Sequence, residues 1–134
     1  MPKNTTTIAD ILAKIFKATA LPWDGAASLD LHLHTADPLV GGISTTSEAT
    51  YASYAVVNVA RSGAGWTGTA PVANAALLQF PQCSAPGANV ITHISITPVG
   101  STQILYRGAL TASLTVDNGI QPQFAIGGLT VTES

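Results

Sequence analysis

Apolar residues recur along the first twenty positions at the spacing of one helix face. Asn4 or the threonines at 5–7 can cap its start, and Pro22 prevents its continuation. The spacing predicts a helix over residues 5–18. The apolar stripe of this helix consists of Ile8, Ile11, Leu12, Ile15 and Phe16. Lys14 and Lys17 are suited to its last turn.

The apolar stripe of this helix has to be covered by another surface. The ordinary interpretation is that the helix covers one side of the protein's own core. A second interpretation is that it docks on a neighbouring subunit. A third, that it lies on a lipid surface, is the weakest because its polar face carries few basic residues.

After Pro22 the pattern changes to short apolar or alternating stretches of the kind that form strands. Turn sequences such as "DPLVGG", "RSGAG", "APGAN" and "DNG" separate them. Residues 39–50 form the longest loop, which we expect to be polar and flexible. The predicted strands are residues 28–35, 54–60, 75–80, 89–99, 102–110, 112–116 and 127–133.

These strands predict a mainly all-β fold, an antiparallel β-sandwich of jelly-roll-like type with at least seven strands in two sheets. Side chains alternate between the two faces of a strand, so one set of apolar residues should form the core. The side chains that we expect to be largely buried are Leu31, Leu33, Val57, Val59, Leu78, Phe80, Ile94, Ile96, Leu105, Leu114, Phe124 and Leu129.

The composition adds information about the surface. Only 9% of the 134 residues are charged, against about 25% in a typical soluble domain. The net charge is −2, the mean hydropathy is +0.34, and 17 Thr and 10 Ser supply much of the polarity. Such surfaces can be buried against other subunits without leaving unpaired charges. The composition therefore favours an oligomer or a component of an assembly.

Charge and hydropathy also argue against several classes of partner. Three of the five basic residues lie near the N-terminus, so there is no basic field to attract nucleic acid. No apolar run approaches the length of a membrane span, and we expect no secretory signal because charged residues interrupt the first apolar positions. Cys83 is the single cysteine, which excludes an intrachain disulfide. We expect no nucleic-acid, membrane or small-molecule partner and no cofactor.

The stretch "DLHLHT" at residues 30–35 is the best candidate for a metal site. On a strand, Asp30, His32 and His34 would share one face. Two imidazoles with a carboxylate are the ligands of a facial triad, and Asp30 or Asp37 could supply the carboxylate. Cupin jelly rolls use such a histidine pair, but they follow it with a Glu, which residues 35–40 lack. The Gly signature expected around a later ligand, His93, is missing too. We therefore expect a solvent-facing or interface strand face, without bound metal.

Catalysis finds little support in the sequence. Cys83 lies in a turn without a basic neighbour that would activate its thiol. The chain contains no G-x-S-x-G motif, and its carboxylates are too few and scattered for a glycosidase pair. The Gly-rich segment "GAGWTG" lacks the Lys of a phosphate loop, so we interpret it as a turn with Trp66 packing over a sheet edge. The prediction is that the chain is not an enzyme.

Seven short segments form an ordered pattern between about residues 29 and 132. They are "LHTADP" (33–38), a Tyr-rich strand (54–59), Trp66, "NAALLQFP" (74–81), "ITHI" (91–94), "YRGAL" (106–110) and "FAIGGL" (124–129). The pattern resembles a family of small tailed-bacteriophage virion proteins often labelled tail fibre proteins. Ala55, Val56 and Arg107 depart from its usual residues, which affects surface details. The structural motif residues that the resemblance implies are His34, Thr35, Asp37, Pro38, Tyr54, Trp66, Asn74, Phe80, Tyr106, Gly108 and Phe124.

The resemblance implies a structural virion protein. Because the chain lacks the length, repeats and coiled coils of a fibre, its compact β domain is also similar to the head-decoration (capsid cement) proteins of tailed phages. Our leading hypothesis is a decoration protein on the phage head surface, made in the bacterial cytoplasm and bound to the major capsid protein. The alternative is a tail or tail-fibre component. A cupin-like metal-binding or sugar-binding module is a more distant possibility.

The sequence also divides into two parts with different expected roles, an N-terminal arm and helix (1–21) and a β-sandwich domain (22–134). Closed oligomers repeat one patch around a rotation axis, and a decoration protein fits the local three-fold positions of a shell. We therefore predict a homotrimer formed by the β domain. The arm should reach the shell or a neighbouring subunit through the apolar stripe and the two lysines.

Overall fold

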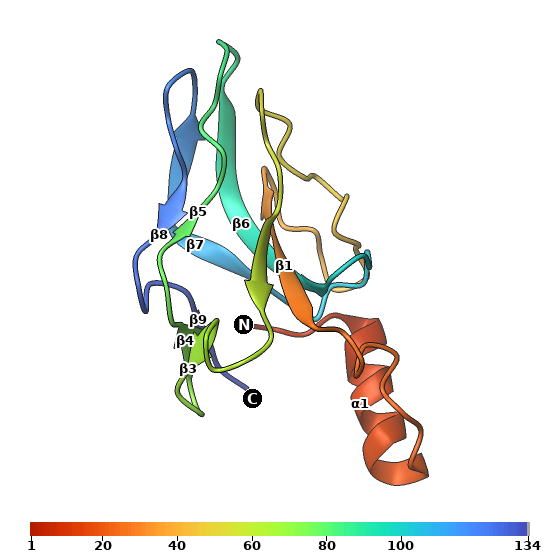
Figure 1. Cartoon of the computed structure of the whole chain (residues 1–134). Coiled ribbons are helices and arrows are strands. Elements are labelled where there is room, and N and C mark those ends of the chain that lie inside the picture. The colour runs from red at the N-terminus through yellow and green to blue at the C-terminus, as the bar shows by residue number, and fades with distance from the viewer. Residues whose placement is uncertain (134) are drawn as a thin grey trace.

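The computed structural model describes residues 1–133, and Ser134, the last residue of the expected β domain, lies outside this range. Within these residues one helix precedes nine strands (Figure 1), which confirms the mainly all-β prediction. The elements are α1 (Thr5–Lys17), β1 (Ser28–His34), β2 (Val57–Ala60), β3 (Trp66–Thr67), β4 (Val72–Asn74), β5 (Leu78–Gln79), β6 (Asn89–Pro98), β7 (Tyr106–Val116), β8 (Gln123–Phe124) and β9 (Thr130–Val131).

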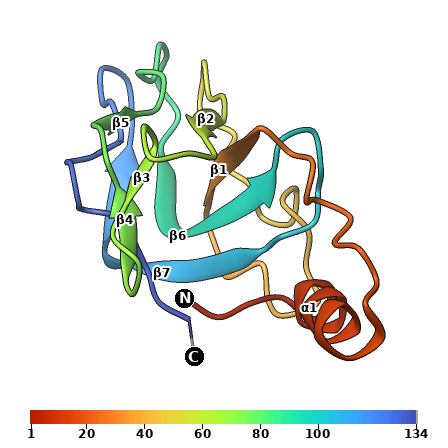
Figure 2. The same cartoon turned by 60° about the horizontal axis from the view of Figure 1, so that its bottom comes forward.

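The strands form three antiparallel sheets instead of the expected two. The largest has the order β2-β1-β6-β7, and the smaller ones have the orders β3-β4-β9 and β5-β8. In two views the small sheets lie on the same side of the large one (Figures 1 and 2), so the fold is a sandwich whose second layer is divided. Strands of two or three residues are too short to form one continuous layer.

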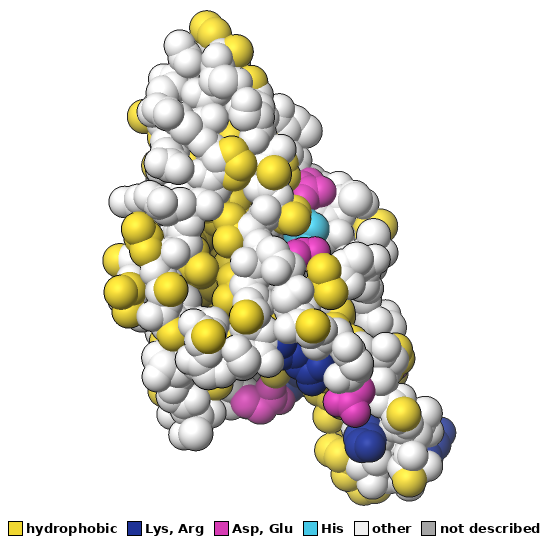
Figure 3. Space-filling model, in the orientation of Figure 1, with side chains coloured by type: hydrophobic (Ala, Val, Ile, Leu, Met, Phe, Trp, Pro, Cys, Tyr) yellow, Lys and Arg dark blue, Asp and Glu magenta, His cyan; other side chains and the backbone are white. Residues whose placement is uncertain are grey.

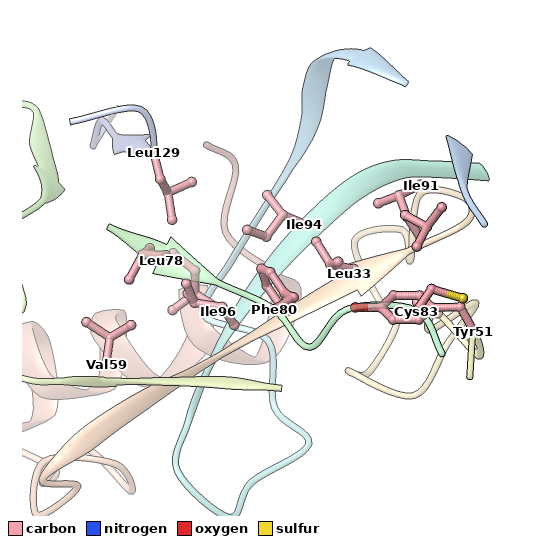
Figure 4. Packing of buried hydrophobic residues seen from close by; sticks show 13 residues of the cluster. Leu33, Tyr51, Val59, Leu78, Phe80, Cys83, Ile91, Ile94, Ile96 and Leu129 are labelled. Atoms are coloured by element: carbon pink, nitrogen blue, oxygen red, sulfur yellow. The ribbon is translucent and has the colours of Figure 1, made fainter. Parts of the chain in front are cut away.

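Strand β1 fixes which side chains enter the core between the layers. Leu31 and Leu33 are paired with Ile96 and Ile94 of β6, and all four are buried. Phe80 lies near Leu33, Ile94 and Ile96 (Figure 4) and is fully buried. The core cluster also contains Ala49, Tyr51, Val59, Leu78, Cys83, Ile91, Val116 and Leu129.

Nine of the twelve side chains predicted to be buried are buried in the structure. Val57 and Phe124 are half-buried and pack against the core cluster. The prediction for Leu114 is wrong, because this side chain is exposed. It lies on β7, which is at the end of the strand order in the large sheet, so the sheet provides no neighbour beyond it.

Strand β7 also unites two segments that the sequence predicted to be separate strands. Its pairing with β6 shifts register between the pairs Ile91↔Leu114 and His93↔Ala109. The chain takes five residue steps on β7 between these pairs, against two on β6. The surplus residues form an irregular bulge that bends the strand. The bulge disturbs the alternation, which explains why the pattern indicated two strands.

Helix α1 begins at the predicted residue and ends at Lys17, because Ala18 adopts a left-handed conformation with φ of 54°. The residues before the helix are bound to the β body: the Arg107 N–H donates to the Pro2 carbonyl, and Lys3 forms a β-bridge with Tyr106. The helix itself projects from the side of the body (Figures 1 and 2). No helix within residues 1–133 has the length and apolar content needed to cross a membrane.

Candidate functional site

The histidine face of β1 is covered by the chain itself, which overturns the expectation of a solvent-facing or interface strand face. His34 is fully buried and His32 nearly so. The loop at residues 35–50 folds back over this face, where the Thr35 N–H donates to the Ser47 carbonyl and the Ala49 N–H to the Leu33 carbonyl. Within the predicted loop at residues 39–50, Ser44 and Ala49 are buried.

Both histidine rings are held by hydrogen bonds at each nitrogen. His32 Nδ1 lies 2.6 Å from Glu48 Oε1, and its Nε2 lies 3.1 Å from the Thr97 hydroxyl. His34 Nδ1 lies 2.9 Å from the Thr46 carbonyl, and its Nε2 lies 2.7 Å from the Ser95 hydroxyl. Because a carboxylate and a carbonyl only accept hydrogen bonds, both Nδ1 atoms carry the proton.

This arrangement leaves no free imidazole lone pair for a metal ion. In the neutral rings each Nε2 accepts a hydrogen bond from a buried hydroxyl group. Asp30 does not join the histidines, since it accepts a hydrogen bond from Asn58. Within residues 1–133 no three His, Cys, Asp or Glu side chains are grouped so that they could hold a metal. Burial lowers the pKa of His34 below its usual 6.5, and the hydrogen bond to Thr46 opposes this shift.

Thr97, His32 and Glu48 are connected in the order hydroxyl, imidazole, carboxylate, which is the order of a hydrolase triad. Thr97 has no exposed surface, so a substrate cannot reach its hydroxyl in this fold. The Glu48 carboxylate also accepts a hydrogen bond from the Tyr54 hydroxyl, which in turn accepts one from the Leu33 N–H. The cluster therefore ties the loop at residues 35–50 to β1.

Several of the structural motif residues hold turns or bring separate segments of the chain together. Asp37 accepts a hydrogen bond from the Leu39 N–H at the start of the predicted turn, beside the buried Pro38. Asn74 is fully buried and joins residues 74–76 to residues 125–129, because it donates to the Ala76 and Ala125 carbonyls and accepts from the Leu129 N–H. Tyr54, Phe80 and Phe124 form a row of aromatic rings, with centroids 6.5 and 6.4 Å apart.

The remaining motif residues occupy separate places in the fold. Thr35 is exposed and donates its hydroxyl hydrogen to the Ser47 carbonyl. Gly108 lies against Met1, where a Cβ atom would come within 3.1 Å of the Met1 side chain. Trp66 begins the edge strand β3, and Tyr106 begins β7. The sequence interpretation of "GAGWTG" as a turn missed β3, although it placed Trp66 at a sheet edge.

The predicted assembly contacts on α1 lie on an exposed face. Ile15 and Phe16 keep 64% and 77% of their surface exposed, and Ile8 and Leu12 are exposed as well. Ile11 is half-buried. Lys14 and Lys17 are also exposed. The interpretation that the stripe covers the protein's own core is therefore wrong.

The side of α1 that contacts the β body is polar. The Thr7 hydroxyl donates to the Ile104 carbonyl at 2.8 Å, and the Gln103 amide donates to the Asp10 carboxylate at 2.7 Å. Asn4, just before the helix, donates its side-chain amide to the Leu39 and Gly42 carbonyls. Sequence reasoning missed these anchors because isolated polar residues on a helix resemble an ordinary wet face.

Comparison with known proteins finds that the chain matches the model of one protein family. A family model described as podophage GP4 fiber I protein gp80 matches residues 3–132. No curated protein matches the chain. The family match covers both α1 and every strand of the described structure.

Proposed function

Because this chain belongs to the podophage GP4 fiber I protein gp80 family, we propose that it is a structural subunit of a virion fibre. The observation that carries this proposal is the family match over residues 3–132. It favours the tail or tail-fibre alternative over head decoration, which had been our leading hypothesis. A fibre subunit acts by assembling with other subunits, and this role requires no catalytic chemistry.

The surface of the chain supports a role in assembly. Few charged side chains lie on the face seen in Figure 3, and apolar ones are frequent there. Contacts between such surfaces leave few charges to be desolvated. The exposed stripe of α1 supplies an apolar contact that the protein's own body does not cover.

In this proposal the subunit is a homo-oligomer, with a trimer as the expected state. Fibres extend from a virion along one axis, and a cyclic oligomer places identical surfaces around such an axis. This symmetry supports a cyclic oligomer, and light scattering coupled to gel filtration measures whether it has three subunits.

The location and number of copies in the virion test the fibre proposal. Gold-labelled antibodies against the chain should mark a tail or fibre structure by electron microscopy, and quantitative mass spectrometry should find few copies per virion. Particles from phage that lack the gene serve as the control for antibody specificity. Hundreds of copies over the head surface would instead support head decoration, with the major capsid protein as the partner.

A further inference from the structure

Helix α1 contacts its own β body with its polar side, whereas a helix that stabilises a core contacts it with the apolar side. Its polar residues Thr7 and Asp10 bind the body, while Phe16 and Ile15 point their apolar surface outward. Figure 3 shows apolar side chains on the surface of the projecting helix. Amphipathic helices normally bury the apolar stripe, so this stripe is suited to a surface on another molecule.

The apolar surface continues from the helix onto the neighbouring loop. The Thr5 N–H donates to the Val40 carbonyl, which places the exposed Leu39 and Val40 beside the start of α1. The exposed side chains of the stripe, together with Leu39 and Val40, expose on the order of 500 Å² of apolar surface. This area is comparable to the largest apolar patch on a typical monomer. A standard interface needs about 800 Å² on each partner. The helix therefore needs a partner with a recess that encloses more of its side chains.

The same chain contains an apolar cavity where the large sheet meets the small sheet β3-β4-β9. Its volume is about 230 Å³. For comparison, an apolar cavity of about 150 Å³ lined by Leu, Ile and Phe binds benzene. The Phe16 side chain is a benzyl group, so this cavity has room for it. The apolar and aromatic lining comes from Leu29, Trp66, Val72, Ile96, Leu105 and Val131.

The chain cannot fill this cavity with its own helix. Phe16 is in the last turn of α1, roughly 16 Å along the helix axis from Thr5. In Figures 1 and 2 the helix projects on one side of the molecule, while β3 and β4 lie on the other. The hydrogen bonds of Thr7 and Asp10 fix the helix in this position. An α1 that enters the cavity has to come from another molecule.

We propose that the last turn of α1, led by Phe16, docks in the cavity between the large sheet and β3-β4-β9 of a second copy of this chain. The proposal rests on the fibre function above and names the contact by which fibre subunits join. The two contacting surfaces carry little charge: the stripe is apolar, with Lys14 and Lys17 of the same helix outside it, and Glu133 at the cavity is already bound to Lys3 and Tyr106. Such a pair of surfaces can meet without desolvating an unpaired charge.

The geometry of this contact is head to tail. Each subunit offers its helix to one neighbour and its cavity to another, so two different surfaces are used at each junction. Contacts of this kind close into a ring when the rotation between subunits allows it, and otherwise extend into a filament. Both outcomes suit a fibre subunit.

Cross-linking between two variants tests the contact. Lys17→Cys, an exposed position beside Phe16 in the last turn of α1, is placed in one protein so that Phe16 is kept. Thr69→Cys, an exposed residue at the cavity, is placed in another. Cys83 is the only natural cysteine and is buried, so a short bismaleimide should report the new pair. We expect a covalent dimer when the two variants are mixed, and none when Val90→Cys, exposed near the start of β6, replaces Lys17→Cys.

Self-association measured by sedimentation gives a second readout. Burying one Phe side chain contributes enough free energy that Phe16→Ser should weaken association about 10- to 100-fold. Thr69→Trp, which crowds the cavity mouth, should weaken it similarly, whereas Val90→Ser should not. Cross-linking of Lys17→Cys only to itself would show that helices pair with each other. A full-length protein that stays monomeric at high concentration would show no self-contact. Either result overturns the docking proposal, while the gold-labelling experiment tests the fibre function separately.

Discussion

At the scale of single residues, the Tyr54 hydroxyl joins β1 to the loop at residues 35–50. It accepts a hydrogen bond from the Leu33 N–H and donates one to Glu48, each at 3.0 Å. Tyr54→Phe leaves the Leu33 N–H without this partner, so the free energy of unfolding should fall by about 1–3 kcal/mol. Urea unfolding measures the change.

Tyr106→Phe is the matched control for this substitution. The Tyr106 hydroxyl binds the exposed Glu133, so its removal should change the free energy of unfolding by less than about 0.5 kcal/mol. Equal losses in the two variants would contradict the role given to Tyr54.

His34 should make the stability of the fold depend on pH. Burial lowers its pKa in the folded state below the usual 6.5, so the unfolded chain binds its proton more readily. Stability is therefore complete above about pH 6.5 and falls as the pH drops from there towards the folded-state pKa of His34. Urea midpoints for the natural protein and His34→Gln, compared on both sides of this window, measure the effect.

The His34→Gln variant should be less stable at every pH, because Ser95 and Thr46 lose their ring partner. Its stability should nevertheless decline less between neutral and mildly acidic pH. Parallel pH profiles for the two proteins would mean that His34 does not titrate in this window.

At the scale of elements, β1 and β7 each carry a leucine between two polar residues, but the two leucines differ in burial. Leu33 is buried against β6, while Leu114 follows the bulge of β7 and is exposed. Leu33→Ala should cost about 2–5 kcal/mol of unfolding free energy, because it leaves a cavity in the core. Leu114→Ala should cost less than about 1 kcal/mol. Chemical unfolding of the two variants checks the difference, and a large loss for Leu114→Ala would contradict the exposed position of this side chain.

The same two elements show what the sequence could predict. The alternation in β1 was regular enough to give its bounds and its core face, since Leu31 and Leu33 are both buried. The extra residues of the β7 bulge broke the alternation, and the two- and three-residue strands β3, β4 and β8 are shorter than any period that a pattern can reveal. Long regular strands were therefore predictable, and the divided second layer was not.

The candidate sites divide in a similar way. The spacing of α1 predicted its apolar stripe, but the direction of that stripe depends on Gln103 and Ile104, which are about ninety residues away in the chain. The histidine pair was visible in the sequence, but its cover comes from the loop at residues 35–50. Long-range contacts of this kind leave no local periodicity, so only the structure shows them.

At the scale of the whole molecule, the low charge content should determine how association responds to salt. Lys14 and Lys17 lie on α1, but the stripe that docks is apolar, and the cavity is lined mainly by apolar side chains. Raising sodium chloride from about 0.05 M to about 0.5 M shortens the Debye length and screens surface charges. An apolar contact does not depend on such charges, so self-association should not weaken.

Sodium sulfate should strengthen self-association, because sulfate favours apolar burial. Sedimentation velocity in the three solutions measures this, with Phe16→Ser as the control that should stay weak in each. Dissociation as salt rises would instead mean that Lys14 and Lys17 hold the second copy by charge.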